Sequence, residues 1–341
     1  MKPLRYFCPL MKEIVVSGIR STGFLHLGNY YGAMRNYTRM QEDFDCFFFV
    51  ADYHSLTTHP DPKDLRASVY RVVAENIASG LDPEKVTLYA QSDVPETTEL
   101  YLLLNTLAYK GELEKVPTFK DKVRSQPNNV NAALLTYPVL MAADILIHKA
   151  TKVPVGKDQE QHLEMARNFA NRFNGRYAEV FPQPHAFNFG EQLIKVPGLD
   201  GSAKMSKSEN GAGTIYLADA DEVIRKKIMK AKTELSPAEA NMPVPESVAN
   251  LFQLLELVSG KEAVAPYQKA WNDTTIRFGD LKKELAEAMI TFVRPIREKA
   301  TALQDSPETI QKILRAGAEK ARASAAQTLE EARRAVGIRY Y

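Results

Sequence analysis

Residues 14–29 read IVVSGIRSTGFLHLGN, which is a short apolar run, a turn with glycines and the start of a longer periodic segment. Similar apolar runs, typical of strands buried on both faces, recur at residues 46–51 and 86–90. Helical periods separate the runs, so the pattern predicts a parallel α/β domain. In such domains ligands bind beyond the carboxyl ends of the strands. We therefore expect a nucleotide site at the turn in residues 14–29.

The glycine spacing in this turn disfavours one common nucleotide site. Gly18, Gly23 and Gly28 are spaced by five, whereas dinucleotide-binding turns have the pattern G-x-G-x-x-G. A phosphate remains compatible with the helix start, because free N–H groups and the helix dipole face an anion there. His26 is either an ordinary core or surface histidine or a hydrogen-bond donor to that phosphate.

Length and composition exclude several classes of protein. The chain has 341 residues, enough for two domains, and its net charge of +2 leaves any nucleic-acid contact to local basic patches. No apolar run approaches the roughly 18 residues of a membrane-spanning helix. Two cysteines, Cys8 and Cys46, exclude a disulfide framework and a four-cysteine metal site. With no export signal visible, we expect a cytoplasmic protein without membrane association or a protein-bound structural metal.

The residue pattern changes near residue 190. Residues 190–213 contain several Gly, Ser and Lys and predict an exposed, mobile loop. Beyond them apolar residues recur at helical spacing. We therefore predict a Rossmann-like parallel-sheet nucleotide-binding domain over residues 11–212, followed by an all-helical domain over residues 213–341.

A lysine pair lies inside that loop, where residues 204–208 read KMSKS. Charge clusters of this kind are usually solvated. Alternatively, mobile cations can close on the β- and γ-phosphates of a nucleotide and neutralise charge as pyrophosphate leaves.

Two further segments carry polar residues in apolar surroundings. Tyr137, Met141 and Asp144 recur at helical spacing and therefore share one face of an apolar helix. A buried carboxylate needs a partner, and for Asp144 this is either a nearby Lys or Arg or a donor on a ligand. Asp158 follows a strand and a turn, where it is either a helix N-cap or an acceptor for ribose hydroxyls.

These motifs in this order resemble the class I aminoacyl-tRNA synthetases, and among them the bacterial tryptophanyl branch. Residues 26–29 (HLGN) are similar to the HIGH motif of the family, and residues 204–208 match its KMSKS motif. The tryptophanyl branch is indicated by residues 137–144, by residues 153–159 running into Gln161 and His162, and by residues 111–115 upstream. The resemblance runs from Met11 over nearly the whole chain. It implies a ligase that uses Mg-bound ATP to convert L-tryptophan to tryptophanyl-adenylate and pyrophosphate, and then transfers tryptophan to the 3′ end of its tRNA.

The resemblance also implies roles for individual residues. Asp144 would accept the indole N–H, in a pocket lined by Tyr137, Met141, Val153 and Val155. The catalytic residues would be His26, Lys204 and Lys207. The ATP contacts would be Arg20, Ser21, Thr22, Gly28, Asn29, Gly156, Lys157, Asp158, Val196, Lys204, Met205, Ser206, Lys207 and Ser208. Residues 20–22 depart from the Gln-Pro-Ser of many members, and Lys120 or Lys122 would correspond to the family's lysines near the triphosphate.

Partners follow from the same resemblance. The helical C-terminal part would read the tRNA anticodon, and members of the family are homodimers. A basic cluster is either a solvated helix face or a surface for RNA phosphates; it comprises Arg225, Lys226, Lys227, Lys230 and Lys232. Two alternatives remain, a tyrosyl-tRNA synthetase and a nucleotide-binding or adenylate-forming paralogue that does not charge tRNA. Asp144 as the single candidate carboxylate disfavours the first, and the helical C-terminal third argues against the second.

Overall fold

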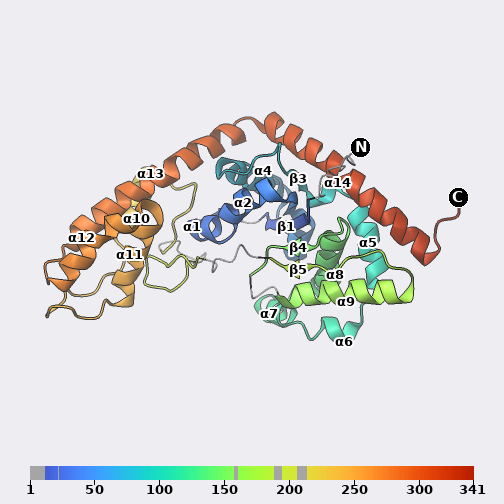
Figure 1. Ribbon diagram of the computed structural model, residues 1–341, viewed down its shortest axis with the longest axis horizontal. Coiled ribbons are helices and arrows are strands. Elements are labelled where there is room, and N and C mark those ends of the chain that lie inside the picture. Colours follow the sequence, from blue (N-terminus) through green and yellow to red (C-terminus); the bar gives the residue numbers. More distant parts are fainter. Residues whose placement is uncertain (1–11, 22, 157–159, 188–193, 206–212) are drawn as a thin grey trace, which may run out of the picture.

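Five parallel strands form one sheet in the order β3-β2-β1-β4-β5. The structure is a computed structural model, and it describes residues 12–21, 23–156, 160–187, 194–205 and 213–341. The strands are β1 (Ile14–Arg20), β2 (Asp45–Ala51), β3 (Thr87–Ala90), β4 (Lys152–Val153) and β5 (His185–Ala186). The parallel α/β fold predicted from the apolar runs is confirmed (Figure 1).

Strand β1 occupies the point at which the strand order reverses. It pairs with β2 from Ile14 opposite Asp45 to Arg20 opposite Ala51, and on its other side Val15 pairs with Lys152 of β4. The chain continues from β1 to β2 and β3 on one side and later adds β4 and β5 on the other, which opens a crevice beyond the carboxyl ends of β1 and β4. The fold itself therefore provides a place for a ligand.

Helices cover both faces of the sheet, because successive β2 side chains point to opposite sides. Phe48 packs in a core with Val72 of α4, whereas Phe47 shares another core with Ala143 of α8 and Phe169 of α9. The longer helices are α2 (Arg35–Asp43), α4 (Pro62–Ala78), α5 (Glu96–Asn105), α7 (Pro117–Ser125), α8 (Ala132–Leu146) and α9 (Glu160–Arg176). The short ones are α1 (Leu27–Asn29), α3 (Asp52–Ser55) and α6 (Lys110–Leu113), with a π-helical turn at Tyr30–Met34 and 3-10 turns at Leu56–Thr58 and Gln91–Asp93.

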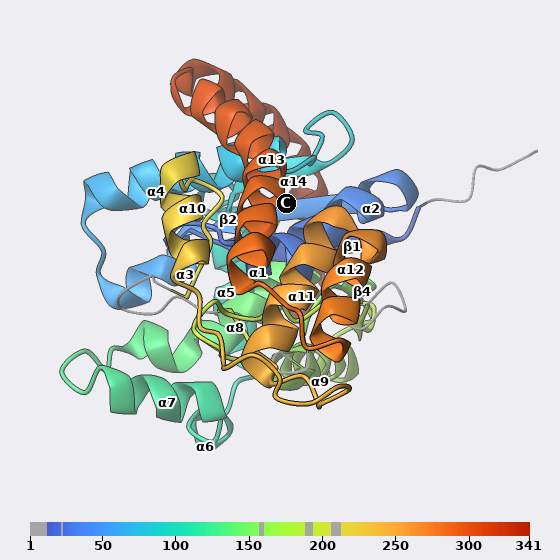
Figure 2. The same ribbon diagram turned by 90° about the vertical axis from the view of Figure 1, so that its left-hand side faces the viewer.

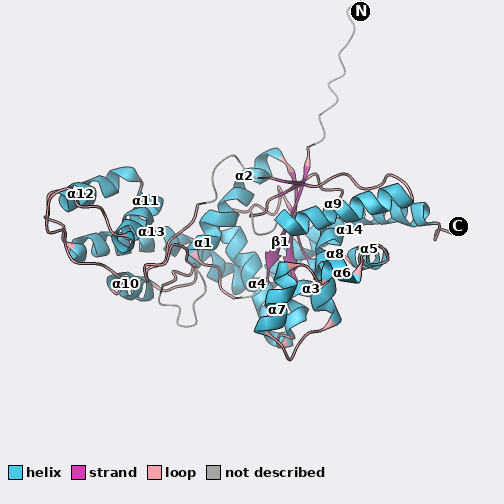
Figure 3. Ribbon diagram, turned by 90° about the horizontal axis from the view of Figure 1, so that it is seen from below, coloured by secondary structure: helices cyan, strands magenta, loops and turns pink. Residues whose placement is uncertain are grey.

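The C-terminal third is helical, as predicted. It comprises α10 (Asp221–Met229), α11 (Glu246–Ser259), α12 (Lys261–Asn272), α13 (Phe278–Gln304) and α14 (Pro307–Val336). Helices α10 to α13 form a bundle, in which α13 lies between α10 and α11 (Figure 2). Seen from below, the bundle lies at one end of the molecule, and α5, α6, α8 and α9 lie toward the other (Figure 3).

Helix α14, which follows the bundle helices α10 to α13 in the chain, packs on the sheet. Ala318 and Ala321 belong to the same buried core as Phe47. A Cβ on Gly317 would lie 1.8 Å from the carbonyl oxygen of Leu88, so only glycine permits this approach of α14 to β3. The buried cores thus extend across residue 212, and the domain limits expected from the sequence stay a prediction.

The expected exposure of residues 190–213 is wrong for much of the described part. Val196, Leu199 and Met205 are buried in the bundle core together with Leu27. They are buried because their apolar side chains pack between the start of α1 and the bundle. Residues 188–193 and 206–212 lie outside the described residues.

Candidate active site

A cavity of about 470 Å³ opens beyond the carboxyl ends of β1 and β4. Its walls come from β1, from the segments that follow β2 and β4, and from α7, α8 and α9. Seven of the residues predicted for the site line it together: Arg20, Tyr137, Met141, Asp144, Val153, Val155 and Gly156. The tertiary structure therefore brings the whole predicted tryptophan pocket to one place.

Asp144 is the buried carboxylate of this cavity. Nε2 of Gln91 lies 2.8 and 2.9 Å from its two carboxylate oxygens, and Nε2 of His54 lies 3.0 Å from one of them. Among the described residues no Lys or Arg pairs with Asp144, so His54 and Gln91 take the place of the cation that one alternative expected. Burial raises the pKa of the Asp144 carboxyl, while the hydrogen bonds from His54 and Gln91 act in the opposite direction. A carboxylate has about four lone-pair sites, so acceptor capacity remains for a ligand N–H.

His54 and Gln91 were not predicted from the sequence. His54 lies in α3, directly after β2, and Gln91 directly follows β3. Parallel strands end at the same edge of a sheet, so polar residues immediately after two neighbouring strands lie close together. That position after the strand ends is the signal that could have identified both residues.

A second polar group lies in the same cavity. The Tyr137 hydroxyl is 2.9 Å from Nε2 of His162, and Thr118 Oγ1 is 3.2 Å from the same nitrogen and contacts the Tyr137 hydroxyl. Burial raises the pKa of Tyr137, while the hydrogen bond with Thr118 and the charge of Arg20 oppose this shift. Thr118 and His162 were missed as site residues, because α7, α8 and α9 bring them to Tyr137 from separate parts of the chain.

The HLGN motif (residues 26–29) lies outside the lining of this cavity. His26 is buried, and its backbone N–H donates to Oδ1 of Asn29 over 3.0 Å. A Cβ on Gly28 would lie 2.9 Å from the His26 ring and 3.6 Å from the carbonyl oxygen of Met205. Met205, a described residue of residues 204–208, is therefore a neighbour of the HLGN motif in space, although the two lie far apart in the sequence.

Other predicted ATP contacts differ in their surroundings. The Ser21 hydroxyl is buried and lies 2.6 Å from that of Ser55, and Val196 accepts a hydrogen bond from the Met205 N–H over 2.6 Å. Lys204 is exposed, and Lys122 lines the cavity. The remaining predictions fall outside the described residues: Thr22, Lys157, Asp158, Ser206, Lys207 and Ser208.

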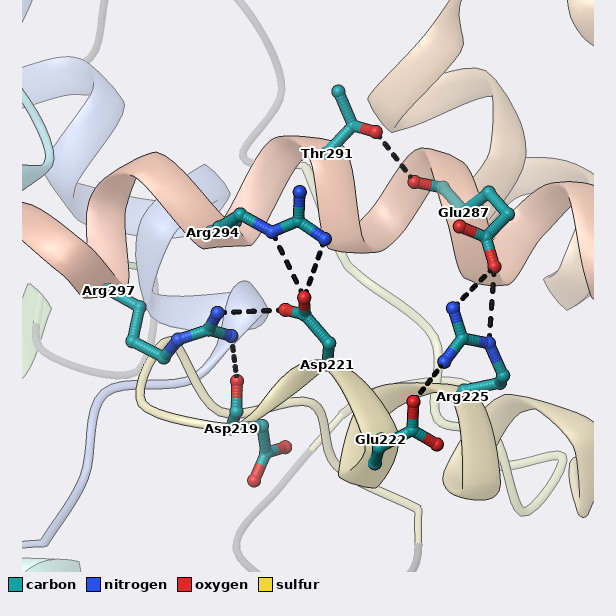
Figure 4. Close-up of polar contacts among 8 residues, drawn as sticks. All are labelled: Asp219, Asp221, Glu222, Arg225, Glu287, Thr291, Arg294 and Arg297. Atoms are coloured by element: carbon teal, nitrogen blue, oxygen red, sulfur yellow. Dashed lines mark hydrogen bonds and ion pairs between the residues drawn. The ribbon is translucent and has the colours of Figure 1, made fainter.

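Acidic residues engage part of the basic cluster. Arg225 lies 2.6 Å from Glu222 and 2.7 Å from Glu287 of α13, and Lys227 lies 2.7 Å from Asp219 (Figure 4 shows the arginine pairs). Three members are exposed, namely Lys226, Lys230 and Lys232. The cluster thus offers RNA fewer unpaired cations than the sequence suggests.

The described part of the chain contains no group of three or more His, Cys, Asp and Glu side chains arranged to hold a metal ion. None of its helices is both long and apolar enough to cross a membrane.

Comparison with known proteins identifies the family. The family model described as class I tRNA synthetases (W and Y) matches residues 11–294. A tryptophan–tRNA ligase of Porphyromonas gingivalis is 56% identical over 328 residues, which are 96% of this chain and 100% of the relative. One from Rickettsia conorii is 41% identical over 335 residues, or 96% and 99% of the two chains.

Solved structures agree. Tryptophanyl-tRNA synthetase from Campylobacter jejuni, complexed with ADP and tryptophan, has a TM-score of 0.86 at 33% identity over 95% of this chain and 99% of its own. A tyrosyl-tRNA synthetase from Aeropyrum pernix, with a TM-score of 0.64 and 20% identity over 89% of each chain, shares the fold. The chain therefore belongs to the W and Y family of class I tRNA synthetases, and within it to the tryptophan–tRNA ligases.

Proposed function

We propose that the protein is a ligase that activates L-tryptophan with ATP, giving tryptophanyl-adenylate and pyrophosphate, and then transfers tryptophan to the 3′ end of its tRNA. Its membership of the tryptophan–tRNA ligases supports this activity. The observation that carries the proposal is the buried Asp144 at a cavity whose other walls include Met141, Val153 and Val155.

Asp144 selects the substrate because its buried carboxylate accepts a hydrogen bond from a donor on the amino acid. The indole N–H supplies one, whereas phenylalanine would leave the buried carboxylate one hydrogen bond short. Sites built on polar readout of this kind reject analogues without the polar group by about 10⁴ to 10⁵. Tyr137, which contacts both Thr118 and His162, completes the proposed amino-acid site.

The proposed nucleotide site lies between the cavity and the HLGN motif. Arg20 and Gly156 would meet ATP at the carboxyl ends of β1 and β4, with Gly28 and Asn29 at the helix start. The remaining proposed contacts are Ser21, Thr22, Lys157, Asp158, Val196, Met205, Ser206 and Ser208. Mg²⁺ would enter with ATP, held by the phosphate oxygens. The bound ion would supply charge neutralisation there.

Activation is a displacement at phosphorus. A tryptophan carboxylate oxygen attacks the α-phosphorus in line, and the bond to the pyrophosphate oxygen breaks with its electron pair. Lys204 and Lys207, with His26 as donor, would neutralise the charge that the pyrophosphate carries away. Positioning and charge stabilisation suffice for this chemistry, so no nucleophilic side chain is required.

The partners and location complete the proposal. Residues 11–212 would form the catalytic domain, and residues 213–341 would read the anticodon. A homodimer is supported by the exposed apolar side chains of Leu102 in α5 and of Tyr109 just before α6. A cytoplasmic location is supported by the scarcity of cysteines and by the tRNA substrate.

The deciding test is amino-acid-dependent exchange of pyrophosphate into ATP, compared for tryptophan, tyrosine and phenylalanine with Mg²⁺ present. Exchange with tryptophan alone supports the proposal. Exchange with tyrosine would make the protein a tyrosyl enzyme, and exchange with none would refute activation. Loading of tRNA with radiolabelled tryptophan then tests the transfer step and excludes a paralogue that does not charge tRNA.

A further inference from the structure

Residues 213–221, which we call the return segment, lie directly against the HLGN motif. The Leu27 N–H donates to the carbonyl of Ile215 and the Leu217 N–H to that of Leu25, each over 2.9 Å. Between these bonds His26 and Tyr216 face each other in an antiparallel bridge, with ring centroids 6.5 Å apart. The return segment therefore fixes the place of the HLGN motif.

Asp219 fixes the shape of the return segment. Its Oδ2 accepts a hydrogen bond from the Tyr216 N–H over 2.9 Å and lies 2.7 Å from Nζ of Lys227. The side chains of Asp219 and Lys227 are only 13% and 17% exposed, so salt screens this pair less than a surface pair. Asp219 thereby connects Tyr216 to α10, which contains Lys227.

Arg297 of α13 in turn holds Asp219. Its Nη1 donates to the Asp219 carbonyl over 2.6 Å, and its Nη2 lies 2.8 Å from Oδ1 of Asp221. Arg294, one turn earlier on the same helix, binds only Oδ2 of Asp221 among the described residues, over 2.6 and 3.0 Å (Figure 4). Both arginines make ion pairs with the Asp221 carboxylate, but Arg297 also donates a hydrogen bond to the backbone of the return segment.

Apolar packing reinforces this line of contacts. Ile296, the neighbour of Arg297, is buried in a small cluster with Leu25 and Leu217, one residue from each side of the antiparallel bridge. Ile310, at the start of α14, packs in the core on one face of the sheet with Phe48. The α13–α14 pair thus connects the HLGN motif to the sheet whose strand ends form the cavity.

We infer that Arg297 is a positioning residue for amino-acid activation, acting through Asp219 and Tyr216 to hold the HLGN motif where it meets ATP. The inference rests on the proposed function. Reacting atoms must be aligned to within about 3–3.5 Å, and displacements of about 1 Å can cost 100-fold in rate. Loss of the Arg297 fork removes the contact to the Asp219 carbonyl and so loosens the return segment and the motif, while the tryptophan pocket keeps all its contacts.

The test compares Arg297→Gln with Arg294→Gln, a matched variant that also loses an ion pair to Asp221. Tryptophan-dependent pyrophosphate exchange gives kcat and the KM for ATP, and calorimetry gives the Kd for tryptophan. We expect Arg297→Gln to lower kcat/KM for ATP by about tenfold or more, with the tryptophan Kd within about twofold of wild type. Arg294→Gln should stay within about twofold in both quantities.

Two results would overturn the inference. One is the same kcat/KM for ATP in Arg297→Gln and Arg294→Gln, and the other is an equal loss of ATP and tryptophan binding, which would indicate general unfolding. If Arg297→Gln does not fold, Arg297→Lys decides, because an ammonium cannot reproduce the fork. A several-fold loss for ATP alone supports positioning, and unchanged kinetics refutes it. Wild-type protein without exchange would refute the proposed function itself.

Discussion

The cavity and the junction between the HLGN motif and the return segment are assembled in different ways. The cavity takes its side chains from strand ends and from one face of α8, so local patterns place most of them. The junction joins residues 26–29 to Met205, to residues 215–219 and to α13. All of these partners lie more than 170 positions after residues 26–29 in the sequence. We therefore expect changes in the cavity to alter the choice of amino acid, and changes in the junction to alter the use of ATP.

The largest effect should come from Asp144→Ala in the cavity. Loss of the carboxylate removes the acceptor for the indole N–H and leaves Gln91 and His54 without their shared partner, so tryptophan-dependent exchange should fall by about 10³-fold or more. Exchange kinetics measure the effect, with Asp121→Asn on the exposed surface of α7 as control. A variant that kept wild-type exchange would remove Asp144 from the substrate site.

A smaller effect, confined to ATP, should follow from Gly28→Ala in the junction. The added Cβ would lie 2.9 Å from the His26 ring, so the ring must move at the position where the HLGN motif meets Met205. We expect kcat/KM for ATP to fall by about 10- to 100-fold, and the tryptophan Kd to stay unchanged. Gly32→Ala is the matched control, because nothing lies within 4 Å of its added Cβ. Equal losses for both substrates would erase the distinction between the two regions.

The contact between α14 and the sheet, which connects the cavity to the junction, should affect stability. Gly317→Ala would place a Cβ 1.8 Å from the Leu88 carbonyl oxygen and push α14 away from β3. Overpacking of this kind destabilises proteins by about 1–3 kcal/mol. Chemical denaturation should show this loss in the free energy of unfolding, whereas Gly279→Ala in α13, with open space around its Cβ, should not. An unchanged stability would mean that α14 is free to shift on the sheet.

The smallest effect should appear only in acid. His148 is buried against Phe47, with its ring nitrogens 2.9 Å from the Tyr89 hydroxyl and 3.1 Å from that of Ser324 in α14. Burial lowers the pKa of His148 from 6.5 to about 3. Below pH 6.5 the imidazole of His148 therefore takes up a proton in the unfolded chain, whereas in the folded protein it does so only near pH 3. The free energy of unfolding falls as the pH falls through this window.

At pH 5 this imidazole should cost about 2 kcal/mol of stability relative to pH 7. The free energy of unfolding, measured at both pH values for wild type and His148→Gln, isolates the contribution of His148 to the pH dependence. The variant should lose less stability between pH 7 and pH 5 than the wild type does. An identical pH dependence would show that other groups carry the acid sensitivity.

The sequence predicted the parts of the site that short-range patterns encode. The apolar runs identified β1, β2 and β3, and the spacing of Tyr137, Met141 and Asp144 placed them correctly on one helix face. Within the protein it gave no partner for Asp144 other than a Lys or Arg, since His54 and Gln91 belong to other strand ends. It also predicted exposure for residues 190–213, because the glycines and lysines there obscure the apolar Val196, Leu199 and Met205.

By itself, the sequence determined the fold class, the order of the motifs and, through them, the family. Periodicity and turn residues act over a few positions, so they can be read without a structure. Only the tertiary structure decided that Gly28 meets Met205, that Arg297 reaches the Asp219 carbonyl and that α14 returns to the sheet. Those contacts join residues 78 or more positions apart, and they form only when the packed cores bring distant segments together, which no local pattern encodes.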